Sequence, residues 1–408
     1  MTKLVDRRIR SKKIESQDTS ESLDQRPLRT AFCLTSMPVG GAETLLLQLV
    51  RNFKRELILP SIVCLKEKGT LGEAIATEVS VTSHWIRHKW DIGIARRLAK
   101  HFLSEKIDAV VTVGAGDKMF WGRIAARLAG VPVVCCALHS TGWPDGVGRL
   151  NRSLTMITDA FIGVAPAHGR FLVDFEKFPE SKVFVIPNGI DTDRFTTCSI
   201  TRDEVRSELG IPWDAPVLGI VAALRPEKNH ALFVQIAKTL SLRMPDARFV
   251  IVGDGPARPS IERRIQDLGL QSRVHLVGNR NDIHRILPSM DVFALTSLNE
   301  ANPVSILEAL SCEVPVVASR VGSISESVLE GITGFTIDPK DCDGFVNRIY
   351  QLLCEPSLAK RIGEKGREHV LRHGSLGNMV SGYERLIHQI YNDKKSNRLG
   401  RSRQPIPI

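Results

Sequence analysis

Short apolar runs alternate with longer amphipathic stretches along most of the chain. In the first half, runs of strand length fall at residues 30–35, 57–65, 109–113, 131–138 and 160–164. Helix-like stretches between them fall at residues 42–53, 92–104 and 121–129. Apolar runs of this length that alternate with helices predict a parallel sheet covered by helices.

A second series of the same kind begins after residue 216. Its predicted strands are residues 217–221, 248–252, 274–277, 292–296 and 314–318, and its predicted helices are residues 230–240, 260–268, 282–289 and 304–310. Between the two series, Pro187 and Gly189 interrupt an apolar run, so we interpret residues 183–191 as a hinge. The pattern predicts an α/β protein with two Rossmann-like, doubly wound domains. These face each other across a cleft at the carboxyl ends of their strands.

The same pattern predicts the extent of each part. We expect an N-terminal domain over residues 28–191, a C-terminal domain over residues 192–376, and an amphipathic helix over residues 377–395 that crosses back to the first domain. The polar ends are expected to be a disordered basic arm, residues 1–27, and a mobile tail, residues 396–408. The first residues lack the apolar core of a secretory signal, and no apolar run is long enough to span a membrane.

Composition narrows the class of protein. Of 408 residues, 43% are hydrophobic and 25% charged, which excludes a disordered or a collagen-like chain. The net charge of +10, most of it within residues 1–195, favours anionic partners: phosphates, nucleic acid or an acidic membrane surface. The eight cysteines are scattered without a CxxC pair, which predicts buried thiols in a reducing cytoplasm and no zinc site.

The most informative segment is residues 291–308. It is a predicted strand, a polar loop and a helix that begins near Pro303, since proline suits the first helical turn. Glu300 and Asn302 therefore lie before a helix N-terminus, where free N–H groups favour phosphate, and Glu308 lies further along the helix. Its carboxylate can accept hydrogen bonds from both hydroxyls of a ribose. For either glutamate alone, a helix cap or a solvated residue is the better interpretation, but the apolar flanks favour a ligand site.

Three further loops follow predicted strands. Arg225 and Lys228 could neutralise a diphosphate, although a basic turn is by itself usually only solvated. The Gly40–Gly41 pair would let a ligand approach the backbone, but it lacks the spacing of a dinucleotide fingerprint. The Gly253 turn is also glycine-rich, but a tight turn without a ligand explains its glycines nearly as well. His139 ends a strongly apolar run at the predicted cleft.

Together these segments resemble the retaining glycosyltransferases of the GT4 group, of the bacterial envelope polysaccharide type, which have the GT-B fold. The resemblance runs from about Thr30 to about Tyr391. Its most specific element is the E-x7-E pattern of Glu300 and Glu308. Matches at residues 186–191, 225–228, 253–256 and 330–335 follow in the expected order.

The resemblance implies a role for each matching residue. The implied catalytic set is His139 near the reacting carbon, Glu300 on the transferred sugar, and Arg225 and Lys228 on the donor diphosphate. The implied donor-binding set adds Gly41, Gly253, Arg280, Asn302, Pro303, Val304 and Glu308, with the base held near residues 278–280 largely by backbone. Many relatives carry Gly-Phe or Gly-Leu where this chain has Ala301-Asn302. We therefore expect Asn302 to contact a sugar hydroxyl and to alter donor choice.

The implied function is a metal-independent, cofactor-free hexosyltransferase that retains the anomeric configuration. The donor would be a UDP-sugar or, second, a GDP-sugar, and the acceptor a hydroxyl of a lipid-linked oligosaccharide or glycolipid in cell-envelope polysaccharide biosynthesis. Two alternatives stay open: a UDP-sugar 2-epimerase of the same fold, and a non-catalytic nucleotide- or anion-binding protein.

The charged N-terminal half bears on the partners. Residues 85–90 place two tryptophans beside cations, and Trp143 lies near His139 in sequence. Such a surface suits anionic lipid headgroups, so we expect a cytoplasmic protein at the inner face of the plasma membrane, with no nucleic-acid partner. The alternative is that these tryptophans pack in the core.

Overall fold

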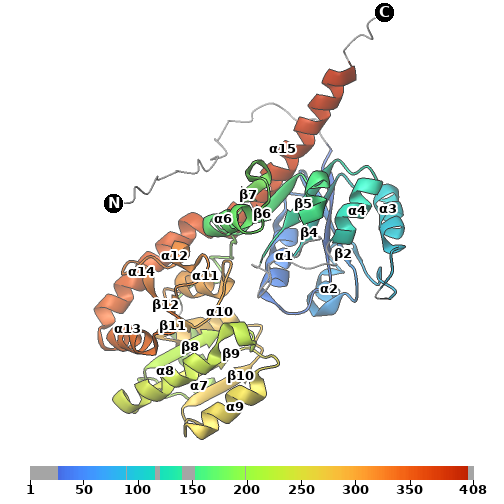
Figure 1. Cartoon of the computed structure of the whole chain (residues 1–408). Helices are drawn as coiled ribbons and strands as arrows, with labels where there is room; N and C mark the ends of the chain where they lie inside the picture. Colours follow the sequence, from blue (N-terminus) through green and yellow to red (C-terminus); the bar gives the residue numbers. More distant parts are fainter. Residues whose placement is uncertain (1–25, 89, 115–119, 140–151, 198, 403–408) are drawn as a thin grey trace, which may run out of the picture.

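The computed structural model describes residues 26–88, 90–114, 120–139, 152–197 and 199–402. Its two sheets lie in separate halves of the molecule, and each is flanked by helices (Figure 1). All strand pairs within both sheets are parallel. The predicted pair of Rossmann-like domains is thereby confirmed.

The N-terminal sheet has the order β3-β2-β1-β4-β5-β6-β7. Its strands are β1 (Leu28–Leu34), β2 (Ile58–Cys64), β3 (Val81–Thr82), β4 (Ala109–Val113), β5 (Val133–Ala137), β6 (Ala160–Gly163) and β7 (Val183–Val185). The helical elements are α1 (Gly41–Asn52), α2 (Gly69–Ile75), α3 (Ile94–Ser104), α4 (Phe120–Leu128), η2 (Leu154–Ile157), α6 (Pro166–Asp174) and η3 (Glu180–Lys182). The chain order reverses at β1, which pairs with β2 on one side and β4 on the other.

The C-terminal sheet has the order β10-β9-β8-β11-β12-β13. Its strands are β8 (Val217–Val221), β9 (Arg248–Val252), β10 (Val274–Gly278), β11 (Val292–Leu295), β12 (Val316–Ser319) and β13 (Gly334–Ile337). The helical elements are α7 (Ser199–Glu208), η4 (Pro226–Lys228), α8 (His230–Arg243), α9 (Arg258–Asp267), α10 (Ile283–Ile286), η5 (Leu287–Ser289), α11 (Val304–Ser311), α12 (Ile324–Ser327), α13 (Cys342–Cys354) and α14 (Pro356–His373). Here the order reverses at β8, between β9 and β11.

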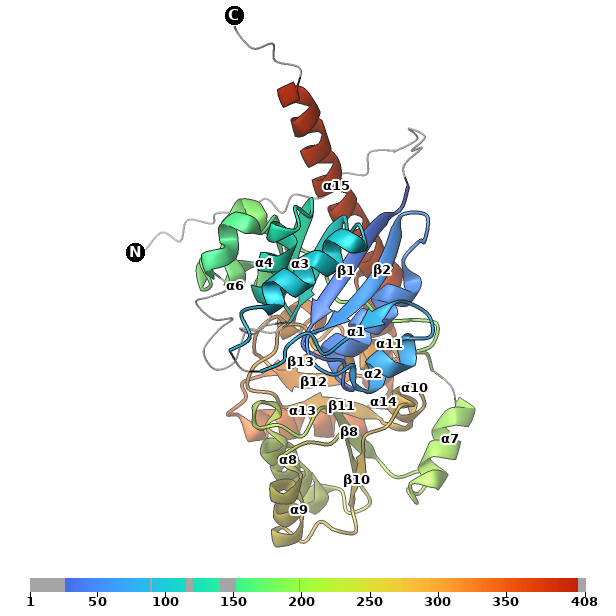
Figure 2. The ribbon, with the colours of Figure 1, turned by 90° about the vertical axis from the view of Figure 1, so that its right-hand side faces the viewer.

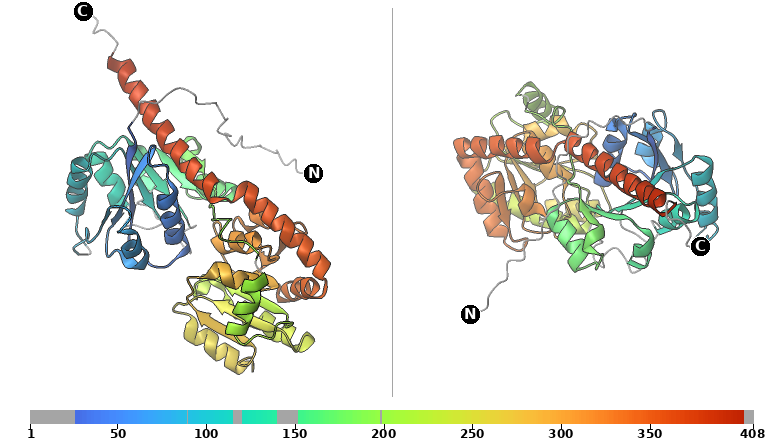
Figure 3. Two further views of the ribbon diagram at one scale, coloured as in Figure 1. Left: turned by 180° about the vertical axis from the view of Figure 1, so that it is seen from behind. Right: turned by 90° about the horizontal axis from the view of Figure 1, so that it is seen from above.

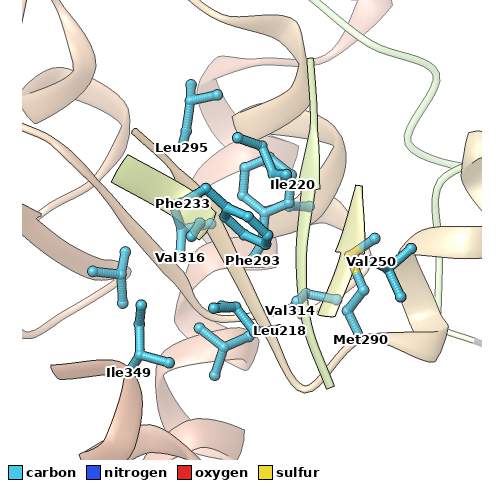
Figure 4. Close-up of a cluster of buried hydrophobic side chains, with 14 of the residues drawn as sticks. Leu218, Ile220, Phe233, Val250, Met290, Phe293, Leu295, Val314, Val316 and Ile349 are labelled. Atoms are coloured by element: carbon cyan, nitrogen blue, oxygen red, sulfur yellow. The ribbon is translucent and has the colours of Figure 1, made fainter. Parts of the chain in front are cut away.

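Each domain has its own apolar core. In the C-terminal domain, Phe233 of α8 and Phe293 of β11 lie among branched side chains from neighbouring strands, such as Leu218, Ile220 and Val316 (Figure 4). These side chains are almost fully buried, and each contributes about 1.5–3 kcal/mol through its removal from water. Strands buried on both faces explain the continuous apolar runs in the sequence.

The C-terminal helix α15 (Leu376–Ser402) joins the two domains. It leaves α14 on the C-terminal domain and runs along the N-terminal domain (Figure 3). Its buried residues complete the N-terminal core: Met379, Val380, Tyr383, Leu386 and Ile387. The helix extends through Ser402, beyond the predicted end of the C-terminal helix at residue 395.

The predicted hinge also needs a correction. Residues Val183–Val185 form strand β7, which pairs with β6 at the edge of the N-terminal sheet. The connection between the domains therefore begins only after this strand, near Pro187. It contacts the start of α15, because Ile190 donates its N–H to Gly374 O at 2.9 Å and accepts from Leu376 N at 2.8 Å.

Among the described residues, five cysteines are buried free thiols: Cys33, Cys64, Cys135, Cys136 and Cys312. Burial raises the pKa of the Cys64 and Cys312 thiols to about 12, so both stay protonated. No helix in the described part of the chain is both long and apolar enough to cross a bilayer.

Candidate active site

The loops that carry the predicted site all follow strand ends. In open parallel sheets, ligands bind beyond the carboxyl ends of the strands where the chain order reverses. In this chain those points are the loop after β1, with Gly41, and the loops after β8 and β11, with Lys228 and Glu300. The two domains meet at these loops, with the N-terminal domain above the C-terminal one in Figure 2. The fold thus brings the predicted residues from distant segments to one region.

An ion pair joins the loops after β8 and β11. Lys228 Nζ lies 2.5 Å from Oε1 of the buried Glu300, which also accepts from Ser297 Oγ at 2.7 Å. Two further bonds tie the loop backbones together: Thr296 Oγ1 to Lys228 O at 3.2 Å, and Leu298 N to Glu227 O at 2.8 Å. Lys228 and Glu300 therefore sit on one rigid unit beside the N-terminus of α11.

Gly322, in the loop after β12, packs against the loop that carries Glu300, and it was not among the residues predicted from the sequence. Gly322 has a φ of +54°, and a Cβ at this position would overlap the carbonyl oxygen of Glu300. Next to it, Ser323 Oγ donates to Ala301 O. Only glycine allows the two loop backbones to lie this close together. The Gly322-Ser323 pair after a predicted strand was visible in the sequence. Nothing in the sequence indicated that this pair packs against the Glu300 loop.

Arg225 is exposed, and its guanidinium has no hydrogen-bond or ion-pair partner among the described residues. On the N-terminal domain, Glu43 of α1 lies close enough for the Arg225 charge to act on it. Burial raises the pKa of the Glu43 carboxyl, and Arg225 opposes that rise. Gly41 opens α1, and a Cβ there would meet no atom within 4 Å. A free cation and an open helix start thus face each other.

Glu308 lies one helical turn inside α11. Its half-buried carboxyl has no hydrogen-bond partner among the described side chains and backbone groups. Burial raises the pKa of this carboxyl to about 7, and the nearby charge of Arg194 partly offsets the effect. An unpaired acceptor at this depth can receive hydrogen bonds from ligand hydroxyl groups.

The turn after β9 packs directly on the loop after β8. Gly253 has a φ of +136°, and a Cβ there would overlap Ala222 O, while a Cβ on Gly255 would lie 2.6 Å from Leu224 O. Nearby, the Arg280 guanidinium is engaged by carboxylates: Asp282 at 2.8 and 2.7 Å, and Glu208 at 2.6 Å. The Arg280 side chain, expected to help bind the donor, is therefore already paired with carboxylates of its own domain.

His139 is half-buried at the end of β5. Burial, with a smaller contribution from His168, lowers the pKa of His139 to about 4, so the ring is neutral at pH 7. Its Nδ1 is buried without a hydrogen-bond partner in the described residues. His168, which the sequence reading did not single out, lies buried on α6, and its Nδ1 accepts from Val164 N at 3.3 Å. The adjacent Trp143 lies outside the described residues.

Asn302 takes part in a contact between the domains. Its side-chain Nδ2 donates to Val164 O at 2.7 Å, and its backbone oxygen accepts from Asn188 Nδ2 at 2.9 Å. Pro303 and Val304 follow as the cap and the first residue of α11. The amide nitrogen that could have met a sugar hydroxyl is thus already bound to the other domain. The side-chain Oδ1 is buried with no partner among the described residues.

The two tryptophans of residues 85–90 have different environments. Trp85 is partly buried, donates from Nε1 to Thr82 Oγ1 at 3.1 Å and packs against His101. Trp90 is 79% exposed, and the neighbouring Ile92 is 77% exposed. In the described part of the chain, no group of three or more His, Cys, Asp or Glu side chains is placed to hold a metal ion.

Two Rossmann-like domains in this arrangement form the GT-B fold, as in the similar solved structures. The model of glycosyl transferases group 1 matches residues 201–369, and that of glycosyltransferase family 4 matches residues 39–194. The chain therefore belongs to the GT4 group of glycosyltransferases, as the sequence motifs indicated.

Named relatives support this assignment. One is an Escherichia coli UDP-Gal:alpha-D-GlcNAc-diphosphoundecaprenol alpha-1,3-galactosyltransferase, 33% identical over 62% of this chain and 68% of the relative. Another is a GDP-mannose-dependent alpha-(1-6)-phosphatidylinositol monomannoside mannosyltransferase of Mycolicibacterium smegmatis, 28% identical over 71% of this chain and 80% of the relative. Among solved structures, Alr3699/HepE of Anabaena in complex with UDP-glucose superposes with a TM-score of 0.78 at 20% identity, covering 90% of this chain and 100% of that one.

Proposed function

We propose that the cleft transfers a hexosyl group from a nucleotide diphosphate sugar to an acceptor hydroxyl, with retention at the anomeric carbon. The observation that carries this proposal is the Lys228–Glu300 pair at the N-terminus of α11, with the unpaired Arg225 beside it. Two cations and free helix N–H groups face the position of a leaving diphosphate. They stabilise the charge that develops on it, so the step needs no metal ion and no cofactor.

The remaining residues of the site hold the donor. Glu300, fixed by Lys228 and Ser297, orients hydroxyls of the transferred sugar, and Glu308 accepts from the ribose. His139, neutral at pH 7, contacts the sugar near the reacting carbon. The acceptor hydroxyl attacks from the side of the leaving group and gives its proton to a phosphate oxygen. The bond to the diphosphate breaks as the new glycosidic bond forms.

We favour a UDP-sugar donor, with a GDP-sugar second, and a lipid-linked acceptor in bacterial glycan synthesis. Support comes from the relatives: one is a galactosyltransferase that takes UDP-Gal and a diphosphoundecaprenol-linked acceptor, and another is a GDP-mannose-dependent mannosyltransferase of a phosphatidylinositol monomannoside. Both acceptors are lipids, which fits the exposed Trp90 and Ile92 on the N-terminal domain. These side chains would enter an anionic membrane surface, with the exposed Arg87 beside them.

Lys228→Ala tests the chemistry. Transfer at saturating donor should fall by ~10²–10³, the usual loss when one group that stabilises developing charge is removed. Lys360→Ala, an exposed lysine on α14, is the matched control and should keep wild-type turnover. The assay measures UDP or GDP release with a lipid-extract acceptor, and the anomeric configuration of the product is read by NMR. Near-normal turnover of Lys228→Ala, or epimer formation from a UDP-sugar without acceptor, would contradict the proposal.

Trp90→Ser tests the membrane surface. Sedimentation with vesicles rich in phosphatidylglycerol should fall, because a large exposed aromatic is lost. Trp213→Ser is the matched control, since Trp213 is 80% exposed but lies on the C-terminal domain. Equal binding of both variants, or binding that does not depend on anionic lipid, would contradict a membrane role for this loop.

A further inference from the structure

The turn between β6 and α6 of the N-terminal domain contacts the C-terminal domain at two places. At the first, Val164 O accepts from Asn302 Nδ2 at 2.7 Å. At the second, Glu326 of α12 accepts from Ala167 N at the start of α6, at 2.9 and 3.1 Å, and from Arg170 Nη2 at 3.0 Å. Figure 1 shows α6 beside α12. We call these two contacts the interdomain seam.

The second contact is electrostatically favourable. The first N–H groups of α6 have no partner within the helix and carry a partial positive charge. The Glu326 carboxylate, 29% exposed, meets this end of the helix and the Arg170 guanidinium together. Charge-assisted hydrogen bonds of this kind are about twice as strong as neutral ones. The seam thus favours one relative position of the two domains.

On the C-terminal side, the seam leads directly to the proposed donor site. Asn302 lies two residues after Glu300, and Ser323, three residues before Glu326, holds Ala301 O through its hydroxyl. Gly322 packs against the backbone of Glu300, and the Glu300 carboxylate binds Lys228. A shift at the seam is therefore transmitted to Glu300 and Lys228 through packed backbone and hydrogen bonds.

On the N-terminal side, the seam borders the proposed catalytic histidine. His168 of α6 accepts from Val164 N, the same residue whose carbonyl holds Asn302. His168 also lies close enough to His139 to lower its pKa. Val164 in this turn therefore bonds both Asn302, in the loop that carries Glu300, and His168, which lies near His139.

We propose that the β6–α6 turn aligns the two halves of the active site, with Asn302 and Glu326 as positioning residues for the transfer step. This inference rests on the proposed glycosyltransfer. It assigns Asn302 to domain alignment in place of the sugar contact expected from the sequence. Glu326 has no counterpart in the sequence-based expectations.

The test compares Asn302→Asp and Glu326→Gln in the full chain. Asn302→Asp keeps the side-chain shape but replaces the Nδ2 donor with an oxygen that repels Val164 O. Both variants should bind UDP, measured by calorimetry, within about threefold of wild type, while kcat at saturating donor falls about tenfold, the scale of one lost hydrogen bond to a buried or charged group. Small-angle scattering should show a larger radius of gyration with UDP bound.

Matched controls lie away from the seam. Asn347→Asp and Glu364→Gln change the same residue types on the surface of α13 and α14 and should keep wild-type kcat and radius. Arg170→Ala removes only an exposed partner of Glu326, so it tests the seam with little risk to folding.

The outcomes separate this inference from the proposed function. If kcat is unchanged in Asn302→Asp, Glu326→Gln and Arg170→Ala, the proposed aligning role of the interdomain seam is wrong. A UDP affinity that falls in parallel with kcat, with the radius unchanged, shows instead that Asn302 contacts the donor. A wild-type chain that neither binds UDP or GDP nor transfers sugar overturns the proposed function. In that case the radius of the ligand-free variants still decides whether the seam holds the domains together.

Discussion

Glu308 is a residue of the proposed site whose ionisation changes within the physiological range. Burial raises its pKa to about 7, so the fraction of carboxylate falls steeply as the pH drops from 8 to 6. Only the ionised form accepts hydrogen bonds from both ribose hydroxyls without a competing O–H donor. The proposed hydrogen bonds from ribose to Glu308 therefore depend on the pH.

We predict that UDP affinity weakens as the pH falls through about 7, and that Glu308→Gln removes most of this dependence while weakening binding at pH 8. Calorimetry of UDP between pH 6 and 8 measures the effect. The 2′,3′-dideoxy analogue of UDP is the control, because it lacks the hydroxyls and should bind with little pH dependence. A pH profile that is the same in wild type and Glu308→Gln would contradict the assignment.

Asn302 shows where reasoning from residues alone ends. Its type and its place before α11 were visible in the sequence, and both suggested a sugar contact. Its actual partner, Val164 O, lies in the other domain, and nothing near Asn302 in sequence points to it. By contrast, Lys228 and Glu300 were each expected in a loop after a strand, and the family resemblance assigned both to one donor site. In the structure their strands are neighbours and the two side chains form an ion pair.

Among the elements, the buried strands were predicted well and the exposed ones poorly. Ala109–Val113, Val217–Val221 and Arg248–Val252 have the predicted bounds, because a strand buried on both faces is a continuous apolar run. Strand β7 was interpreted as hinge, since it is short, partly exposed and followed by Pro187. Helices α13 and α14 were not predicted at all. Helix α13 buries Phe345, Val346, Ile349 and Leu352, so its apolar spacing was a signal that the prediction missed, whereas α14 is rich in charged residues.

The loop that carries Gly322 is the element whose geometry is least tolerant of change. We predict that Gly322→Ala lowers transfer by more than about tenfold and lowers the free energy of unfolding, because its Cβ would overlap Glu300 O at a positive φ. Gly331→Ala is the control: its φ is +69° but its Cβ would meet open space, so it should cost only the about 1–2 kcal/mol of left-handed backbone strain. Urea unfolding and turnover measure both. Equal losses in the two variants would show that backbone strain alone matters.

Helix α15 belongs to the N-terminal core although it comes last in the chain. We predict that Leu386→Ala lowers the free energy of unfolding by about 2–5 kcal/mol, because it leaves a cavity at a fully packed position. Leu371→Ala, 46% exposed on α14, should change it by no more than about 0.5 kcal/mol. Thermal and urea unfolding followed by circular dichroism measure both. A small effect of Leu386→Ala would mean that α15 docks only weakly.

At the scale of the whole molecule, the net charge of +10 first suggested any polyanion. Family membership replaces nucleic acid with a diphosphate donor as the expected anion, and Arg225 and Lys228 lie where that donor is proposed to bind. Most of the excess lies within residues 1–195, the part of the chain that also exposes Trp90 and Ile92. The positive charge and the exposed apolar side chains are independent observations, and both support the proposed acceptor surface on the N-terminal domain.

Two segments connect the domains: the linker that includes residues 189–191, and the chain between α14 and α15. Residues 189–191 contact the start of α15, and a Cβ on Gly189 would overlap Ser375 O. Beside this contact, a pocket of about 400 Å³ is lined by Lys54, Asp191, Ser381 and Glu384 among others.

We predict that Gly189→Ala pushes the linker away from α15 and misaligns the domains. UDP affinity should stay within about threefold of wild type, because the C-terminal site is intact, while turnover falls about tenfold or more through loss of alignment. Gly377→Ala is the control, since a Cβ there meets no atom within 4 Å. Turnover and calorimetry with UDP measure both variants. If Gly189→Ala kept wild-type turnover, the contact between linker and α15 would not set the domain geometry; if it lost UDP binding as well, the change would have reached the donor site itself.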